Sequence, residues 1–286
     1  MMSPRAARRR VSSVRHAGRG GPALAAALII LLVLTGCASA APPPPALALP
    51  PVGGGLDYQL GGAYDPPAGV DIVVRDSTAA PAAGRYSICY LNGFQTQPAA
   101  TPRLLADSPE LILTADGSPV RDDNWPDELL FDTRTAEQRA GIAALLLPQI
   151  AHCRANGFDA VELDNLDSYT RSAGLLTADD NLALAALLVD GAHAAGLAVG
   201  QKNAADLAAG LAGTFDFAVI EECDRWQECE LYTAAYGDHV LAIEYADDLR
   251  LDFAAACALP GRPRSMILRD RALVPAGSPG YVYERC

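Results

Sequence analysis

The sequence predicts an α/β fold, a single (β/α)8 TIM barrel, and two observations lead to this prediction. Short apolar runs rich in β-forming residues alternate with helical patterns, which is typical of parallel strands joined by helical crossovers. Without its first 36 residues the chain keeps 250 of its 286 residues, about the usual size of such a barrel. We therefore expect one domain over residues 56–286.

The first 36 residues have the pattern of a signal peptide. They contain six arginines and no acidic residue, and the apolar run Ala23–Leu34 is too short for an ordinary membrane span. The motif Leu34-Thr35-Gly36-Cys37 resembles a bacterial lipobox, which predicts that Cys37 is lipidated and that the protein is an extracytoplasmic lipoprotein anchored to the membrane. If Cys37 is incidental, the segment is an ordinary secretory signal and the protein is secreted. Residues 37–55, rich in Pro, Ala and Gly, are expected to form a disordered tether.

Nine strand candidates compete for eight barrel positions, and Leu129–Asp132 is the one that we expect to be extra. Thr177, followed by two aspartates, is expected to cap a helix N-terminus, and Gly196 its C-terminus. The predicted helices are Thr135–Asn156, Thr177–Ala195 and Leu249–Leu259. The predicted strands are Leu56–Leu60, Val70–Asp76, Tyr86–Leu91, Leu129–Asp132, Ala160–Asp164, Ala198–Asn203, Phe217–Glu222, Val240–Tyr245 and Ser265–Asp270.

The mature chain is strongly acidic. Six of the 22 basic residues and none of the 34 acidic ones lie in the signal segment, so its removal changes the net charge from −12 to −18. Nucleic acid is therefore excluded as a partner. The charge suits a cationic substrate, although acidity that serves only solubility explains it equally well. We expect a monomer.

Besides Cys37 the chain has six cysteines, an even number that fits disulfide formation in an oxidising compartment. Cys223 and Cys229 are close enough in sequence to close a small loop, and Cys257 and Cys286 are placed to fix the C-terminus. Cys89 and Cys153 either pair or remain thiols.

Polar residues stand at the carboxyl ends of separate predicted strands, where (β/α)8 enzymes assemble their active sites. Any single one of these residues could be a helix cap or a solvated side chain. Polar residues at the ends of so many strands are harder to explain in that way. The segment Val161–Asp167 is the most crowded, and carboxylates at the end of a buried strand are costly unless paired, which suggests acid/base or nucleophilic chemistry. The strand-end residues are Asp76, Asn92, Asp132, Asp164, Asn203, Glu221, Glu222, Glu244 and Asp270.

Several sequence blocks together carry a resemblance to a known family. The most specific are Gly157–Tyr169, Gly200–Asn203, Glu221–Cys223 with Cys229, Ile243–Tyr245 and Leu268–Asp270, and weaker ones are Tyr58–Leu60, Asp71–Asp76, Ile88–Tyr90 and Asn124–Pro126. Over about 56–286 the chain resembles the bacterial and fungal endo-α-1,4-polygalactosaminidases, glycoside hydrolase family 114, which are (β/α)8 enzymes. It departs from the family at Leu163, where Pro is usual, and in the loop 92–100.

The resemblance implies an exported hydrolase that cleaves α-1,4-linked, galactosamine-containing polysaccharide internally with a pair of carboxyl groups. It implies Asp164 as nucleophile or base and Glu221 as acid, and the opposite assignment of the two roles stays open. Strand alternation places Glu162 on the face of Asp164, one layer deeper, where it would orient its neighbours, and Glu222 on the opposite face. Retention and inversion both remain open.

Lys202 is the only lysine of the chain. A lone lysine at a barrel strand end raises a Schiff-base aldolase as a rival interpretation, because desolvation lowers a lysine pKa into the reactive range. Export and the absence of a phosphate-binding glycine loop argue against it. We expect Lys202 instead to pair with Asp164 or Glu162.

The histidines offer no metal site or catalytic triad, because none of them stands at a strand's carboxyl end: His16 lies in the signal segment, His152 and His193 in predicted helices, and His239 before a strand. We therefore expect no metal and no other cofactor. A divalent-ion site made of Asp164 and Asp167 is the remaining alternative.

Aromatic side chains near strand ends are candidates for stacking on sugars and for attracting their ammonium groups. Core packing is the alternative for the tyrosines, whereas Trp125 and Trp226, in polar loops, are expected to be exposed. A non-catalytic glycan-binding lipoprotein on the same barrel stays a second interpretation. The full set expected to bind a partly deacetylated polysaccharide is Tyr58, Gln59, Asp76, Trp125, Glu162, Asn165, Asp167, Tyr169, Lys202, Asn203, Trp226, Glu244 and Tyr245.

Overall fold

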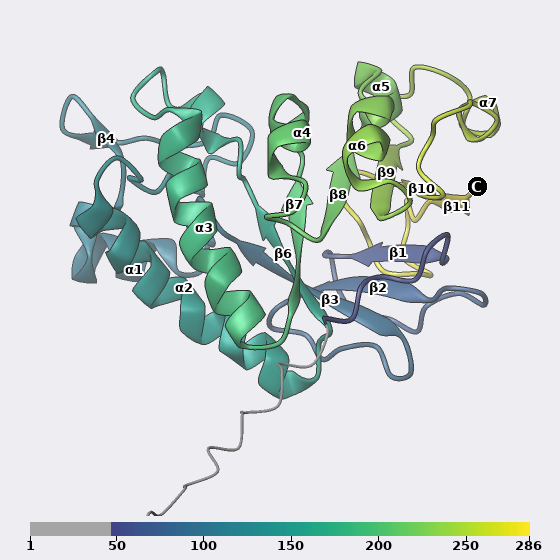
Figure 1. The fold of residues 1–286 in the computed structure, drawn as a ribbon, viewed down its shortest axis with the longest axis horizontal. Helices are drawn as coiled ribbons and strands as arrows, with labels where there is room; N and C mark the ends of the chain where they lie inside the picture. The colour runs from purple at the N-terminus through teal and green to yellow at the C-terminus, as the bar shows by residue number, and fades with distance from the viewer. Residues whose placement is uncertain (1–46) are drawn as a thin grey trace, which may run out of the picture. The chain divides into compact units, whose positions relative to one another are not determined.

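The computed structural model describes residues 47–286, and a barrel of eight parallel strands forms its centre (Figure 1). This confirms the predicted (β/α)8 fold. The strands pair in sequence order, and a ninth, β11 (Tyr283–Arg285), adds antiparallel to the last of them. The barrel strands are β1 (Leu56–Gln59), β2 (Ile72–Asp76), β3 (Tyr86–Asn92), β6 (Ala160–Asp164), β7 (Ala198–Lys202), β8 (Phe217–Glu221), β9 (Val240–Tyr245) and β10 (Ser265–Arg269).

The barrel is nearly closed, and a buried arginine bridges its seam. Among the described residues β1 and β10 share no backbone ladder. Instead the Arg269 guanidinium donates to the carbonyl oxygen of Tyr58 and lies 3.3 Å from the Asp57 carboxylate. Arg269 and Asp57 are both fully buried, so each charge relies on the other for its stabilisation.

Alternation along the strands divides the apolar residues between two cores. Ile72 and Val74 on β2 and Phe217 and Val219 on β8 point into the barrel and form part of its interior cluster. Ala218 and Ile220 on the same strand β8 point outward and pack beneath the helices. Side chains two positions apart therefore share a face, and the last inward-pointing residue of each strand lies at the carboxyl-end mouth.

A long excursion between β3 and β6 contains the segment predicted as an extra strand. It holds α1 (Thr101–Asp107), the 3-10 turn η1 (Pro109–Leu111) and the small hairpin of β4 (Thr114–Ala115) and β5 (Ser118–Pro119). Leu129, Leu130 and Phe131 make only isolated bridges to this excursion, which confirms that the segment is not a barrel strand. Asp132, expected at the mouth, instead pairs at 2.6 Å with Arg134.

The two long helices lie side by side on one flank of the barrel (Figure 1). They are α2 (Ala136–Asn156), capped by Thr135, and α3 (Ala178–Ala194), which begins with a capping box between Thr177 and Asp180. The predicted helix Leu249–Leu259 is wrong in length: only α7 (Phe253–Cys257) forms, because Asp252 caps its first turn. The remaining helices are η2 (Ser168–Arg171), η3 (Ala205–Leu207), α4 (Ala208–Leu211), α5 (Cys223–Trp226) and α6 (Cys229–Tyr236). Within residues 47–286, no helix has the length and apolar character needed to cross a membrane.

The signal peptide, Cys37 and most of the predicted tether lie outside the described residues. The last part of that tether, residues 47–55, is not the disordered segment that its composition predicted. The Tyr86 hydroxyl donates to the carbonyl oxygen of Ala48, and Ser265 donates to that of Gly54. The segment packs because its backbone polar groups find partners on the barrel.

Three disulfides join elements of the barrel. The predicted pairs Cys223–Cys229 and Cys257–Cys286 are confirmed, with Cα atoms 4.8 Å and 5.2 Å apart. Cys89 of β3 and Cys153 of α2, which the sequence left open, also pair. This third disulfide is fully buried and closes the longest loop, with a sequence separation of 64.

Removing these disulfides is expected to destabilise the fold in proportion to the loops that they close. By the chain-entropy relation, Cys89→Ala with Cys153→Ala lowers the free energy of unfolding by about 4 kcal/mol, and Cys223→Ala with Cys229→Ala by about 2 kcal/mol. Urea unfolding at equal m-values measures both. Equal losses for the two pairs would argue against this entropic origin.

Candidate active site

Three carboxyl groups surround a single ammonium group at the carboxyl-end mouth of the barrel. Lys202 Nζ lies 3.0 Å from Glu162 Oε1, 3.1 Å from Asp164 Oδ1 and 3.2 Å from Glu221 Oε2. The residues come from the adjacent strands β6, β7 and β8, and each points into the barrel by alternation. Glu162 is fully buried, whereas the Asp164 and Glu221 side chains keep 18% and 25% of their surface exposed. Asp164 and Glu221 are therefore the two carboxyl groups of this cluster that are open to solvent.

Each of the three carboxyl groups also accepts a hydrogen bond from a tyrosine of another strand. Tyr58 of β1 donates to Glu162 Oε1 at 2.7 Å, and Tyr90 of β3 donates to Asp164 Oδ2 at 2.5 Å. Tyr245 of β9 donates to Glu221 Oε1. Tyrosines from three further strands thus hold the three carboxyl groups in position.

The buried charges shift the pKa values in opposite directions. Burial opposes ionisation of Asp164, but Lys202, the Tyr90 hydroxyl and the Asn165 backbone N–H outweigh it and hold the Asp164 pKa below its usual value. Burial raises the pKa of Glu162 to about 7 despite Lys202. Burial disfavours the Lys202 ammonium, yet Asp164, Glu221 and their neighbours keep its pKa well above the ordinary value. The site at neutral pH therefore holds an ionised Asp164 beside a permanent ammonium.

Two asparagines in left-handed backbone conformations shape the strand ends. Asn203, with φ of 46°, accepts the Glu221 backbone N–H at 2.9 Å and approaches Glu221 Oε2 at 3.4 Å. Asn165, with φ of 65°, donates its backbone N–H to Asp164 Oδ1 at 2.8 Å. Strained backbone of this kind persists where neighbouring contacts fix it, often at functional sites.

Two further predicted residues, Asp167 and Tyr169, lie on the rim beyond Asp164. Asp167 pairs with Arg171 at 3.0 Å, and Arg171 also pairs with Asp122 at 2.7 Å. The Tyr169 hydroxyl approaches Asp206 at 3.4 Å. The Asp167 carboxylate is therefore already paired with a cation of this protein, Arg171.

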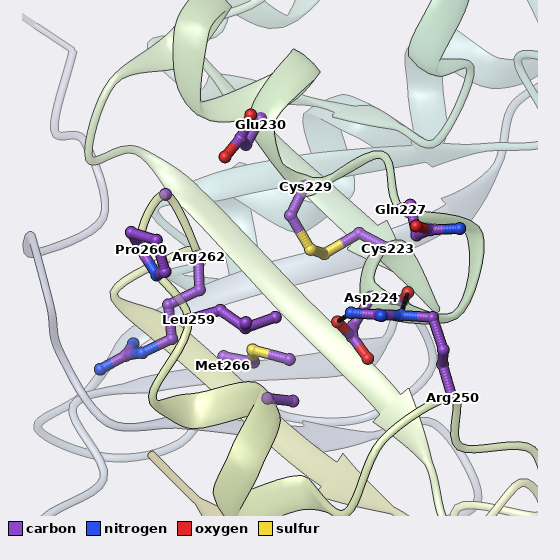
Figure 2. A pocket seen from close by; sticks show the side chains of 12 residues that line it. Cys223, Asp224, Gln227, Cys229, Glu230, Arg250, Leu259, Pro260, Arg262 and Met266 are labelled. Carbon is purple, nitrogen blue, oxygen red and sulfur yellow. Dashed lines mark hydrogen bonds and ion pairs between the residues drawn. A yellow bond between two sulfur atoms is a disulfide. The ribbon is translucent and has the colours of Figure 1, made fainter.

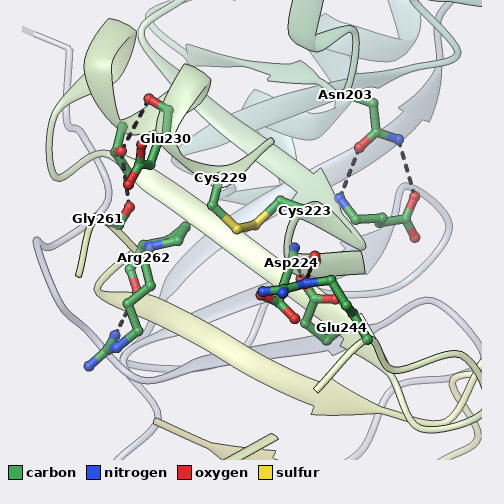
Figure 3. Close-up of a disulfide and its surroundings, with 12 residues drawn as sticks. Asn203, Cys223, Asp224, Cys229, Glu230, Glu244, Gly261 and Arg262 are labelled. Carbon is green, nitrogen blue, oxygen red and sulfur yellow. Dashed lines mark hydrogen bonds and ion pairs between the residues drawn. A yellow bond between two sulfur atoms is a disulfide. The ribbon is translucent and has the colours of Figure 1, made fainter. Parts of the chain in front are cut away.

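The structure does not bring every predicted site residue to the cluster. Glu244 alternates with Tyr245, so it faces outward and accepts the Asp224 backbone N–H near the Cys223–Cys229 disulfide (Figure 3). Gln59 also faces outward, between Asp57 and Arg75. The prediction that Glu244 and Gln59 lie in the site is wrong. The sequence located the ends of their strands but not the face of the sheet from which each side chain projects.

Two other placements are corrected in part. Asp76 ends β2, but its carboxylate accepts the backbone N–H and hydroxyl of Thr78, so it closes its own turn. Tyr58 is fully buried and contacts Glu162 and Lys202, so it offers no surface for stacking on a sugar. Trp125 and Trp226 are 62% and 58% exposed, as predicted.

Sequence reasoning missed two residues close to Asp164. Tyr90 stands in one of the recognised sequence blocks, and the two-residue alternation of β3 was the signal that could have placed it in the site. Glu128 lies in the excursion after β3 and accepts from Asn92 Nδ2 at 2.7 Å, and Asn92 is the register partner of Asp164. Burial raises the Glu128 pKa to about 7. No local pattern marks Glu128, because a 36-residue separation brings it to Asn92.

A cavity of about 340 Å³ lies apart from the cluster, beside the Cys223–Cys229 disulfide. Figure 2 shows the Arg250 guanidinium beside the Asp224 carboxylate in its wall, a pair 2.5 Å apart. The two sulfurs approach Glu244 within 4.8 Å. Because both sulfurs form the disulfide, neither supplies a thiolate ligand for a metal.

The family model that matches the chain is that of glycoside-hydrolase family GH114, over residues 37–286. A search of curated proteins finds no match.

Among solved structures, the chain is similar to Ega3 of Aspergillus fumigatus, determined in complex with galactosamine. The TM-score is 0.65 at 23% identity, covering 84% of this chain and all of that one. It is also similar to the glycoside hydrolase domain of PelA from Pseudomonas aeruginosa, with a TM-score of 0.53 at 19% identity, covering 78% of this chain and 97% of that one. At these identities the similarity supports the fold.

Proposed function

Because the chain belongs to glycoside-hydrolase family GH114, we propose that it is an endo-acting glycosidase of α-1,4-linked, galactosamine-containing polysaccharide. The observation that carries the proposal is the pair of partly exposed carboxyl groups, Asp164 and Glu221, on either side of one ammonium. Glycosidic cleavage needs two such groups, one to protonate the leaving oxygen and one to act as nucleophile or base. No metal or other cofactor enters this chemistry.

Asp164 is assigned as the nucleophile and Glu221 as the acid. A nucleophilic carboxylate must be ionised at working pH, and the low pKa of Asp164 meets this requirement. Two oxygens that share Lys202 Nζ at 3.1 Å and 3.2 Å cannot be farther apart than the sum of those distances. Facing oxygens this close leave little room between the carboxyl groups for the water that an inverting enzyme places there, and we propose a retaining mechanism.

A polycationic substrate suits this site. Ega3, a structural neighbour, was determined in complex with galactosamine. The predicted mature chain has a net charge of −18 after loss of residues 1–36, and ammonium groups of a partly deacetylated polymer are attracted both to carboxylates and to aromatic faces. Asn165 contacts Asp164, and Asn203 and Tyr245 contact Glu221, while Asp167 and Tyr169 follow in the loop after β6 and are proposed to contact the polymer farther out.

The rival aldolase interpretation conflicts with the state of Lys202. A Schiff base forms from a neutral amine, whereas three carboxyl groups keep the Lys202 pKa well above its ordinary value. The non-catalytic glycan binder stays the alternative to be tested, because the same surface would serve binding without cleavage.

The place of action is proposed to be outside the cytoplasm. The arguments are the signal peptide pattern of residues 1–36, the lipobox ending in Cys37 and the three disulfides of the barrel. Lipidation at Cys37 would hold the enzyme at the membrane as a monomer. Metabolic labelling with a fatty acid, compared between the parent and Cys37→Ala, tests this anchor.

Release of oligosaccharides from partly deacetylated α-1,4-galactosaminan by the purified protein tests the activity. The proposal expects products of several lengths early in the reaction, because internal bonds are cleaved. Binding of the polymer without any release would favour the glycan binder. Cleavage of fully acetylated polymer alone would contradict the cationic substrate.

Replacing Trp226 is expected to weaken substrate binding more than catalysis. Trp226 ends α5, five residues after Glu221, with 58% of its surface exposed and the Arg225 guanidinium 5.1 Å from its ring. Loss of one sugar-stacking face raises KM about tenfold with a small change in kcat for Trp226→Ala. Leu231→Ala, which removes an exposed apolar side chain on α6, is the matched control and leaves KM unchanged. An unchanged KM for Trp226→Ala excludes the stacking role.

A further inference from the structure

Lys202 Nζ lies between the two oxygens among which the proposed reaction moves negative charge. It is 3.1 Å from Asp164 Oδ1 and 3.2 Å from Glu221 Oε2, and the lysine side chain is only 3% exposed. We propose that Lys202 is a positioning residue whose one ammonium is counter-ion to Asp164 before cleavage and to Glu221 after it. This inference rests on the proposed function, which it deepens.

The charge balance of the reaction requires such a transfer. The proposed roles require Asp164 to be a carboxylate and Glu221 to carry a proton before cleavage. As the glycosidic C–O bond breaks, the Glu221 proton passes to the leaving oxygen and an Asp164 oxygen bonds to the anomeric carbon. The negative charge has then moved from Asp164 to Glu221. Water afterwards gives its proton to Glu221 and its oxygen to the sugar, which frees the Asp164 carboxylate.

The same transfer occurs if Asp164 acts as a base. Asp164 then gains a proton from water while Glu221 gives one to the leaving group, so the charge again ends on Glu221. A fixed ammonium at nearly equal distance from both groups stabilises each arrangement without reorganisation of its own. Burial strengthens this effect, because little water screens the charges.

Glu162 and Tyr58 hold the ammonium in this place from below. Lys202 Nζ lies 3.0 Å from Glu162 Oε1 and 3.1 Å from the Tyr58 hydroxyl, which itself donates to Glu162. The second oxygen of Glu162 is buried and has no hydrogen-bond partner among the described residues. An unpaired buried oxygen costs less on a neutral carboxylic acid than on an anion, and burial raises the Glu162 pKa to about 7. Below that pH the neutral Glu162 carboxyl group still contacts the Lys202 ammonium, but it does not neutralise the positive charge.

Lys202→Met is the variant that tests the proposal. Loss of the ammonium lowers kcat on galactosaminan about 100-fold or more, the scale found when one preorganised electrostatic contact is removed. It also moves the acid limb of the kcat/KM profile to higher pH. The acid limb moves in this direction because Lys202 lowers the Asp164 pKa. Without Lys202 the effect of burial dominates, and Asp164 becomes protonated at higher pH.

Other titratable groups face this site and stay in place in the variant. They come from β1, β3, the excursion, β6, β8 and β9, and are Tyr58, Tyr90, Glu128, Glu162, Asp164, Glu221 and Tyr245. A carbon-13 NMR pH titration of the Asp164 carboxyl group, in parent and variant, reports its pKa without any substrate. If the parent protein does not cleave the polymer, the proposed function is wrong. The titration is independent of that result, because it measures the effect of Lys202 on the Asp164 pKa without substrate.

Two further variants separate charge from folding. Lys202→Met with Glu162→Gln removes the buried acid together with its cation and keeps the variant testable if the single change prevents folding. Arg250→Met is the matched control, because it removes a cation paired at 2.5 Å with the buried Asp224 outside the cluster. It is expected to lower stability and to leave the acid limb in place. A Lys202→Met enzyme with an unshifted acid limb, or with kcat within threefold of the parent, would overturn the proposal.

Discussion

Asparagine in place of Asp164 is expected to lower kcat on galactosaminan about 10³-fold or more. The substitution keeps the size of the side chain and an oxygen for the Tyr90 hydroxyl, 2.5 Å away in the parent, but removes the negative charge that attacks or activates the attacking water. KM is expected to change much less, because substrate contacts lie mainly on the surrounding rim.

Initial rates of oligosaccharide release measure this loss, with circular dichroism to verify folding. Asp190→Asn, on the exposed face of α3, is the matched control and retains full activity. Undiminished cleavage by Asp164→Asn would refute the catalytic assignment of this residue.

Glutamine in place of Glu221 is expected to lower kcat on the polymer by a similar factor of about 10³, because the leaving oxygen then receives no proton. An aryl glycoside with a phenol of low pKa needs no such proton in the first step. On that substrate, Glu221→Gln is expected to retain far more of the activity of glycosyl transfer than Asp164→Asn does.

The comparison of the two substrates decides the roles of the two carboxyl groups. If Asp164→Asn is the variant whose activity depends on the leaving group, the assignment is reversed. The anomer released first, followed by proton NMR, tests the retaining mechanism: the α-anomer is expected, since the carboxyl oxygens are held on one ammonium.

The barrel follows from the sequence because its signals are local. The alternation of strands and helices, the Thr177 cap and the surplus of strand candidates at Leu129–Asp132 all depend on neighbours within a few residues. The predicted helix Leu249–Leu259 is too long, because most of that segment forms a loop. The spacing of its apolar residues does not distinguish the loop from a helix. Residues 47–55 likewise pack on partners such as Tyr86 and Ser265, which composition does not reveal.

The eight strands and the acidic strand ends are predictable from the sequence, because residue type and period are enough for those. Which strand-end residues meet, including the carboxyl groups around Lys202, depends on how the barrel closes. Glu244 and Gln59 stand at strand ends but face outward, whereas Tyr58, Tyr90 and Tyr245 reach the carboxyl groups from three other strands. The physical reason is that closing the barrel converts a two-residue alternation into contacts between side chains far apart in sequence, such as Tyr58 and Lys202, separated by 144 positions.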